Sequence, residues 1–250
     1  MLNIVIPMAG AGSRFAQLGY TDPKPLIPIH GIPMIQAVIK NLKPDVSHRF
    51  IFICQKEHVR VYGLADKFKQ WAPDSVVVEL DGITEGAACT VLTAQLLIDN
   101  DEPLMIANSD QYVDIDINEY LNEMDGKNLD GLIMTMKAID PKWSFVGMGA
   151  DGLVTRVIEK EVISDEATVG IYNFKRGCNF VAGAKEMIEM DERVNGEFYV
   201  APVYNRLIAD GQKIGIFNIG SEGKGMYGLG IPSDLNYFLD NPISQQVIAS

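Results

Sequence analysis

The sequence has few cysteines and no long apolar run. Its cysteines, Cys54, Cys89 and Cys178, are scattered without C-x-x-C spacing, so neither a disulfide framework nor a zinc site is indicated. No apolar stretch reaches membrane-spanning length. The N-terminus leads directly into a strand, without the basic and apolar regions of a secretion signal. We therefore expect a cytoplasmic protein that has no membrane partner.

Positive charge is also scarce. The 250 residues contain 21 Lys and Arg against 33 Asp and Glu, a net charge of −12. This balance argues against a nucleic-acid polymer or an anionic membrane as partner, because either would need a basic face. An acidic protein that handles phosphates must concentrate its few cations locally or recruit a metal ion. The histidines, His30, His48 and His58, form no cluster and are assigned no chemistry.

A glycine-rich loop follows the apolar run Leu2–Pro7. Gly10 and Gly12 allow backbone N–H groups to approach a polyanion closely. Arg14 can add a bidentate phosphate contact, and Lys24 a point charge. Phe15 replaces the third glycine of a dinucleotide fingerprint, and no Gly-Lys-Ser/Thr of a P-loop follows. A tight turn would also explain the glycines alone, but the added Lys24-Pro-Leu-Ile-Pro segment favours nucleotide binding.

Strands and helices alternate through the first half of the chain. The spacing predicts helices over 34–42 and from 55 to about Trp71, and a longer helix over 86–98 that begins at a glycine turn. Pro33 is predicted at or near the first helical position. Strands are predicted at 2–7, 50–54, 75–80 and 103–107. This alternation indicates an α/β fold with a mixed, mostly parallel central sheet covered by helices on both faces.

The second half is predicted to be richer in antiparallel strands. Gly149–Gly152 is typical of a hairpin turn. We expect one domain over residues 1–250, with a nucleotide-binding half at about 1–125 and an acceptor-binding half at about 126–250. Further strands are predicted at 130–139, 145–148, 153–160, 168–174 and 213–219, and helices at 178–190 and 199–209.

Three segments are expected to meet at one edge of the sheet. Asn108-Ser-Asp110 directly follows the carboxyl end of a buried strand, where ligands bind in open α/β sheets. The glycine loop and the Thr84–Thr90 turn should converge on the same crevice. Asp110 is the best candidate ligand for Mg²⁺, which prefers oxygen donors. A loop aspartate that caps a turn is the alternative.

Two later charged segments admit two interpretations each. Lys160, within Glu159-Lys-Glu161, is either a cation that holds the phosphate of a second substrate or part of a solvated charged run. Glu197 either accepts hydrogen bonds from substrate hydroxyls or amines, or favours a helix N-terminus electrostatically, and the residues alone favour the helix. Trp71 and Trp143 are interpreted as packing residues.

Taken together, these motifs resemble the sugar-1-phosphate nucleotidyltransferase (pyrophosphorylase) superfamily. The opening G-x-G-x-R and K-P-L-x-P motifs are present at 10–14 and 24–28, and Asn108–Asp110 resembles the segment that carries the metal-binding aspartate. Val157–Lys160 resembles the E-K motif, 168–172 the N-x-G-x-Y strand with Thr168 in place of Asn, and 195–199 the G-E segment. The resemblance implies a Rossmann-like, GT-A-like three-layer sandwich.

One segment departs from the family pattern. Where W-x-D-x-G-T-P-x-D-L is common, this chain has Met226–Leu235, with Gly228 in place of the second metal-binding aspartate. Asp234 matches only the later position and is expected to open the last helix. The variant resembles a short subgroup found with capsule and surface-polysaccharide genes.

The resemblance implies that a phosphate oxygen of an acceptor attacks the α-phosphorus of an NTP, with pyrophosphate as leaving group. Arg14 and Lys24 would be catalytic, acting on the pyrophosphate and the α-phosphate. Asp110 would hold Mg²⁺. The implied nucleotide contacts are Met8, Ala9, Gly10, Ala11, Gly12, Thr84, Gly86, Ala87 and Asp110, and the implied acceptor contacts are Lys160, Gly170, Glu197 and Tyr199.

Several alternatives stay open. The acceptor is expected to be a sugar 1-phosphate, but CTP with a phospho-amine or a phosphorylated amino-acid amide is a second possibility. A GT-A glycosyltransferase would be expected to carry D-x-D, whereas this chain has Ser109-Asp110-Gln111. A non-catalytic nucleotide sensor is possible because Gly228 removes a ligand. The sequence also permits a homo-oligomer.

Overall fold

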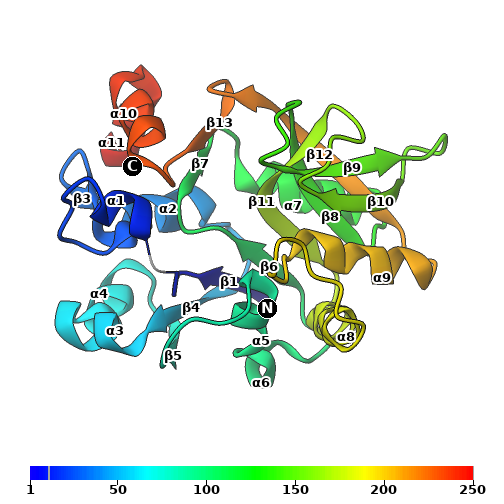
Figure 1. The fold of residues 1–250 in the computed structure, drawn as a ribbon, viewed down its shortest axis with the longest axis horizontal. Helices are drawn as coiled ribbons and strands as arrows, with labels where there is room; N and C mark the ends of the chain where they lie inside the picture. The colour runs from blue at the N-terminus through cyan, green and yellow to red at the C-terminus, as the bar shows by residue number, and fades with distance from the viewer. Residues whose placement is uncertain (11, 250) are drawn as a thin grey trace.

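One large sheet connects the two halves of the chain (Figure 1). The computed structural model describes residues 1–10 and 12–249. The main path of the sheet is β5-β4-β1-β6-β11-β8-β12-β13-β7, and the β9–β10 hairpin joins it through β11. The strands are β1 (Leu2–Pro7), β4 (His48–Gln55), β5 (Val76–Leu80), β6 (Leu104–Ala107), β7 (Gln111–Val113), β8 (Gly131–Lys137), β9 (Ser144–Met148), β10 (Val154–Glu159), β11 (Glu166–Phe174), β12 (Ile214–Glu222) and β13 (Gly225–Gly228).

The predicted mixed, mostly parallel sheet is confirmed. Strands β5, β4, β1 and β6 are parallel neighbours, and β8 and β12 are also paired in parallel. β11 lies antiparallel between β6 and β8, so those two strands share one direction. The expectation of antiparallel additions in the second half is confirmed for the pairs that β11 makes with β6, β8 and β9 and for the β9–β10 hairpin. It is wrong for β12, which pairs in parallel with β8 and β13.

Helices cover both faces of this sheet, as the α/β pattern predicts. Residues of β1 alternate between the faces: Ile4 and Ile6 belong to one buried cluster, and Val5 to the other. The first cluster packs under α2 (Met34–Leu42), α3 (Lys56–Tyr62), α4 (Leu64–Trp71) and α7 (Ile117–Gly126). The second packs under α5 (Ala87–Leu92), α6 (Gln95–Ile98), α8 (Gly177–Glu189) and α9 (Tyr204–Ala209).

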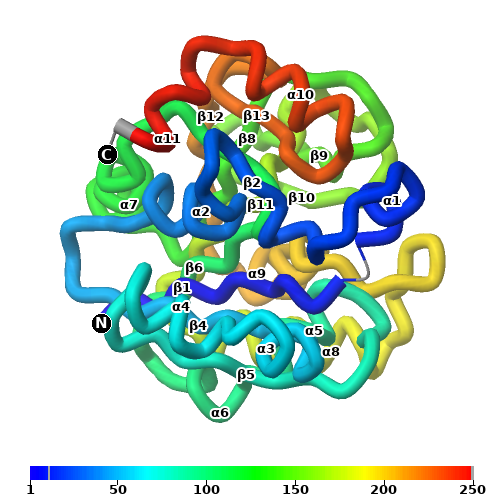
Figure 2. The backbone as a smooth tube through the Cα atoms, turned by 90° about the vertical axis from the view of Figure 1, so that its left-hand side faces the viewer, coloured from blue at the N-terminus to red at the C-terminus, as the bar shows by residue number. Residues whose placement is uncertain are grey.

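A third cluster brings the end of the chain back to its beginning. Leu235 and Phe238 of α10 (Pro232–Asp240) pack with Phe15 of α1 (Ser13–Ala16) and with Met34. Figure 2 shows α10 and α11 (Gln246–Ala249) beside the N-terminal β2 (Pro28–Ile29) and α2, and β3 (Ile32–Pro33) is paired with β2. This packing fixes the segment that contains Gly228 next to the elements that carry Lys24. Asp234 lies in the first turn of α10 as expected, but α10 is not the last helix, because α11 follows it.

Some element boundaries differ from the predicted ones. Gly63, with φ of 60°, divides the predicted helix before Trp71 into α3 and α4. The predicted helix over 86–98 is two helices, and Pro33 is the N-cap residue of α2. Ala201–Val203 forms a 3-10 helix before α9. Two other 3-10 helices are Lys24–Leu26 and Pro242–Gln245.

Within residues 1–10 and 12–249, no helix is both long and apolar enough to cross a membrane.

Candidate active site

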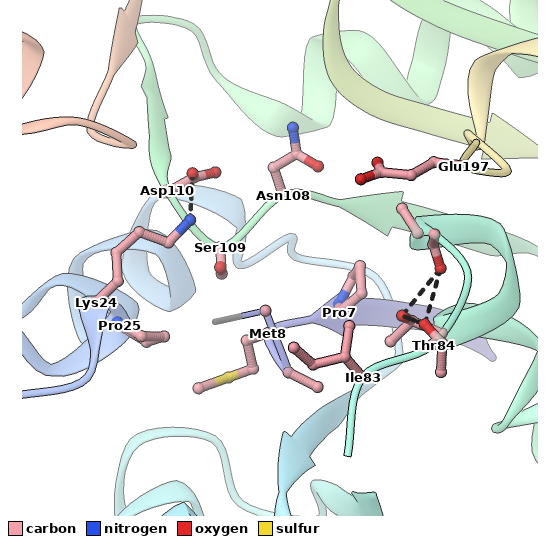
Figure 3. Close-up of a pocket in the computed structure, with 15 residues that line it drawn as sticks. Pro7, Met8, Lys24, Pro25, Ile83, Thr84, Asn108, Ser109, Asp110 and Glu197 are labelled. Atoms are coloured by element: carbon pink, nitrogen blue, oxygen red, sulfur yellow. Dashed lines mark hydrogen bonds and ion pairs between the residues drawn. The ribbon is translucent and has the colours of Figure 1, made fainter. Parts of the chain in front are cut away.

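A cavity of about 520 Å³ opens at the carboxyl ends of β1 and β6 (Figure 3). The glycine loop after β1, the Ile83–Ala87 turn and the Asn108–Asp110 loop line it, together with Lys24 and Glu197. Parallel strands β1 and β6 are neighbours, so the loops that follow them lie together. The segments that the sequence predicted to converge thus share one cavity.

Lys24 and Asp110 form an ion pair at one side of this cavity (Figure 3). The Nζ–Oδ2 distance is 2.7 Å, and both side chains are about three-quarters buried, at 23% and 24% exposure. The Leu229 N–H donates to the Asp110 carbonyl oxygen at 2.8 Å. A Cβ at Gly230 would lie 2.6 Å from Oδ2 of Asp110, so a larger residue there would require this carboxylate to shift.

The glycine turn before α5 is joined to the Glu197 segment. The Ala88 N–H donates to the Phe198 carbonyl oxygen at 3.0 Å, and the Phe198 N–H donates to the Glu85 carbonyl oxygen at 2.9 Å. Gly86 has φ of 133°, and a Cβ there would lie 2.5 Å from the Phe198 nitrogen. The two backbones therefore approach as closely as glycine allows. Any displacement of this turn would also move Glu197.

Gln55, the last residue of β4, holds two loops of the cavity together. Its Nε2 donates to the carbonyl oxygens of Ala9, at 2.6 Å, and Gly82, at 2.7 Å. The side chain thus fixes the glycine loop relative to the loop that leads to Thr84. Sequence reasoning missed Gln55, although its place at the end of a parallel strand was a signal for it.

A second cavity, of about 280 Å³, adjoins the first. Ala87 and Asn108 line both cavities, so the two spaces meet at these residues. Gly170 has φ of 81°, and a Cβ there would overlap the Asn108 side-chain amide. Glycine at this position therefore permits Asn108 to lie at the junction. The remaining walls are Lys142, Trp143, Ser144, Glu159, Thr168, Val169, Tyr172, Tyr199, Val200 and Ala201.

Lys160 lies against this second cavity through Tyr199. Its Nζ is 2.5 Å from the Tyr199 hydroxyl oxygen and 4.7 Å from the centre of the ring. That hydrogen bond is the main reason why the pKa of Lys160 is raised. Lys160 has φ of 59°, an uncommon backbone for a residue other than glycine, and it breaks the alternation of side chains at the end of β10.

Glu159, the residue before Lys160, is 8% exposed at the wall of the second cavity. Its carboxylate accepts a hydrogen bond from the Ser144 hydroxyl. Burial raises the pKa of Glu159, whereas the Ser144 hydrogen bond and the Lys160 charge lower it, and Glu197 raises it further.

Residues 4–214 match a family model described as Nucleotidyl transferase. The chain belongs to this family. The resemblance drawn from the motifs is thereby confirmed, as is the expectation of an enzyme of the nucleotidyltransferase class.

Individual relatives agree with the family assignment. "Bifunctional protein GlmU" of Methanococcus maripaludis is 28% identical over 256 residues, which cover 98% of this chain and 56% of that protein. The chain therefore spans little more than half the length of this relative. A crystal structure titled nucleoside-diphosphate-sugar pyrophosphorylase, from Vibrio cholerae RC9, has a TM-score of 0.81 and 27% identity, covering 95% of this chain and 100% of that one.

A shorter match is more similar. "2-aminoethylphosphonate cytidylyltransferase" of Lancefieldella rimae is 52% identical over 40 residues, which are 16% of each chain.

The donor atoms present fit a magnesium ion that arrives with a nucleotide. In the described part of the chain, no group of three or more His, Cys, Asp or Glu side chains could hold a metal ion. Asp110 offers one carboxylate into the cavity, and Gly228 offers none. Mg²⁺ is commonly held by one or two protein carboxylates with phosphate oxygens and waters, so one carboxylate beside a triphosphate suffices.

The structure brings most of the predicted nucleotidyltransferase residues together. Arg14 is exposed on α1, and Arg14, Gly12 and Lys160 line neither cavity. Ala11 lies outside the described residues. Trp143, interpreted as a packing residue, packs against the core and also lines the second cavity. The larger cavity is lined by Met8, Ala9, Gly10, Lys24, Thr84, Gly86, Ala87, Asp110 and Glu197, and the smaller one by Gly170 and Tyr199.

Proposed function

We propose that this chain transfers a nucleoside monophosphate from an NTP to the phosphate of a small acceptor, with release of pyrophosphate. A sugar 1-phosphate is the proposed acceptor class. One observation carries the proposal: two cavities meet at Ala87 and Asn108, one lined by the glycine loop and the other by Tyr199, whose hydroxyl accepts a hydrogen bond from Lys160. A triphosphate in the first and an acceptor phosphate at the second would meet at this junction.

The reaction is an in-line displacement. An oxygen of the acceptor phosphate forms a bond to the α-phosphorus, and the bond from that phosphorus to the bridging oxygen breaks, with the electron pair leaving on pyrophosphate. Such chemistry requires mainly positioning and charge neutralisation from the protein. The two-cavity arrangement would position the acceptor phosphate against the α-phosphorus.

The residues of the larger cavity would hold the triphosphate. Backbone N–H groups of the glycine loop would cradle it, and Lys24 would neutralise the α-phosphate as charge shifts toward the leaving group. Arg14, exposed on the short helix that follows the loop, would contact the departing pyrophosphate. Asp110 would hold Mg²⁺, which when bound neutralises charge on the phosphate oxygens. Thr84, Gly86 and Ala87 would contact the base.

Residues of the smaller cavity, together with the adjacent Lys160 and with Glu197 of the larger cavity, would hold the acceptor. Lys160 would bind the attacking phosphate while the Tyr199 hydroxyl orients its ammonium. Gly170 would contribute by leaving space for Asn108 at the junction. Glu197 projects from the segment that is bonded to the nucleotide turn, so it would contact the acceptor close to the transferred group.

The relatives support the sugar phosphate class, because one neighbouring structure is titled a nucleoside-diphosphate-sugar pyrophosphorylase. A nucleotide-activated sugar made in the cytoplasm, where NTPs are supplied, would serve as a precursor of surface or capsular polysaccharide. A second candidate is a CTP-dependent enzyme that acts on a non-sugar phosphate. The 40-residue match to a relative named 2-aminoethylphosphonate cytidylyltransferase favours this candidate.

The test is a matrix of ATP, CTP, GTP, UTP and dTTP against candidate phosphates with Mg²⁺, scored by pyrophosphate release. We expect release with one or two NTPs and only when an acceptor is present. Release of a nucleoside diphosphate would indicate a GT-A glycosyltransferase instead. Triphosphate binding without pyrophosphate release for every acceptor would indicate a nucleotide sensor.

A further inference from the structure

The buried carboxylate of Glu159 has no cationic partner. Its side chain forms no ion pair with another described residue, and its hydrogen-bond partner is the neutral hydroxyl of Ser144. Lys142, which lines this cavity, is paired with another carboxylate, because its Nζ lies 3.0 Å from Glu222. Buried carboxylates are ordinarily paired with a cation or bound to a metal, because burial removes the hydration that stabilises the charge.

The adjacent Lys160 has the complementary property. Its ammonium is bonded to the neutral Tyr199 hydroxyl, and it forms no ion pair with a carboxylate in the described part of the chain. Lys160 and Glu159 influence each other's charge, yet they are not hydrogen-bonded. An anion thus lines the small cavity, and a cation lies directly behind its Tyr199 wall, without a hydrogen bond or ion pair between the two charges.

From this arrangement we infer that the acceptor is a zwitterion, with its phosphate on Lys160 and a protonated amine on the carboxylate of Glu159. The inference rests on the proposed function, because it names the acceptor of that reaction. It applies to an amino-sugar phosphate and to a phospho-amine alike, since both present an ammonium group and a phosphate.

A hydroxyl in place of the amine would leave the buried charge uncompensated. Ser144 already provides a neutral donor, and a second neutral donor adds a hydrogen bond but no positive charge. Glu197 increases the demand for a cation, because its negative charge acts on Glu159 from the side of the larger cavity.

Matched pairs of probes test the inference. Binding of 2-aminoethyl phosphate is compared with binding of 2-hydroxyethyl phosphate by calorimetry on the full chain, and glucosamine 1-phosphate with glucose 1-phosphate. We expect the amine member of at least one pair to bind roughly 10- to 100-fold more tightly, the range of a charge-assisted hydrogen bond. The pair that shows the preference identifies the source of the amine. Equal binding within both pairs, or binding of neither amine, overturns the inference.

Two variants locate the preference. Glu159→Gln keeps the shape of the side chain and should remove the amine preference, while the affinity for the hydroxyl member changes less than about threefold. Glu161→Gln is the matched control, because Glu161 is exposed. A preference that survives in E159Q contradicts the assignment of Glu159. The probe comparison uses the wild-type chain, so it can contradict the inference even if the E159Q variant misfolds.

Pyrophosphate release separates this inference from the proposed function. If the amine member binds more tightly but no NTP yields pyrophosphate, the proposed function fails and the zwitterion site remains. If pyrophosphate is released equally well with both members of each pair, the proposed function stands and the inference fails.

Discussion

Lys24 Nζ lies 2.7 Å from Asp110 Oδ2, so the only charged pair of the larger cavity in the described structure is neutralised internally. Both groups are proposed to contact the nucleotide complex, Lys24 through a phosphate and Asp110 through a magnesium ion. Nucleotide binding would therefore replace one ion pair by two new ones. The pair keeps both side chains aimed into the cavity before the nucleotide arrives.

Replacement of Lys24 by alanine should lower kcat roughly 100-fold or more and change stability little. The catalytic loss reflects a positive charge removed from the transition state. The effect on stability is small because a partly exposed ion pair contributes about 0–1 kcal/mol. Steady-state pyrophosphate release and urea unfolding measure the two effects. Lys69→Ala, on the exposed surface of α4, is the control and should change neither. Near-normal turnover of K24A would contradict the assigned role.

Divalent metal should bind weakly to the protein alone and tightly with a triphosphate. One carboxylate, already paired with Lys24, is a poor site by itself. Binding of Mn²⁺ is followed by electron paramagnetic resonance, with and without the preferred NTP. Asp110→Asn should lower the affinity of the ternary complex about tenfold. Tight Mn²⁺ binding without nucleotide would show that another carboxylate replaces the one absent at Gly228.

Gly86→Ala should destabilise the fold by about 2–4 kcal/mol and weaken both substrates. Its Cβ would collide with the Phe198 backbone, which cannot move without Glu197. Gly82→Ala is the control, since Gly82 also has a positive φ, of 95°, but open space around it. Denaturant unfolding and the KM values for NTP and acceptor are compared. If the two variants lose equal stability, backbone strain alone explains the effect.

Glu159→Gln should make the ligand-free protein more stable at neutral pH. Burial raises the pKa of Glu159 above its ordinary value of 4.5, so the folded state favours the protonated carboxyl. The contribution of the wild-type carboxyl to the free energy of unfolding is therefore fully present below pH 4.5. This contribution is lost as pH rises through the raised pKa. Glutamine lacks this loss. Urea unfolding across pH should show equal free energies of unfolding for wild type and E159Q in acid, and a higher value for E159Q as pH rises through the raised pKa of Glu159. E161Q should follow the wild type. Parallel curves would contradict this expectation.

The motifs at the start of the chain predict much of the larger cavity. Gly10, Lys24 and Asp110 could be selected because each follows a recognisable strand or lies in a recognisable motif, and parallel strands place their carboxyl ends at one edge. The roles of Trp143, Glu159 and Gln55 could not be predicted in this way, although Gln55 ends a parallel strand and Glu159 lies in the E-K motif. Each role depends on tertiary neighbours. Trp143 forms a cavity wall, Glu159 lacks a cationic partner, and Gln55 donates to two carbonyl groups from distant loops.

The sequence by itself determined the α/β class, the three layers and the family, because local periodicity and short motifs encode them. The tertiary structure alone decided that β8 and β12 run parallel, since strand direction depends on pairing across the sheet. It also decided that Glu159 and Lys160, adjacent in a charged tripeptide, differ so strongly in environment. The Glu159 carboxylate is buried, and the Lys160 ammonium is bonded to Tyr199, because of how β9, β10 and the Tyr199 segment pack together. Such packing between distant segments cannot be predicted from a local sequence pattern.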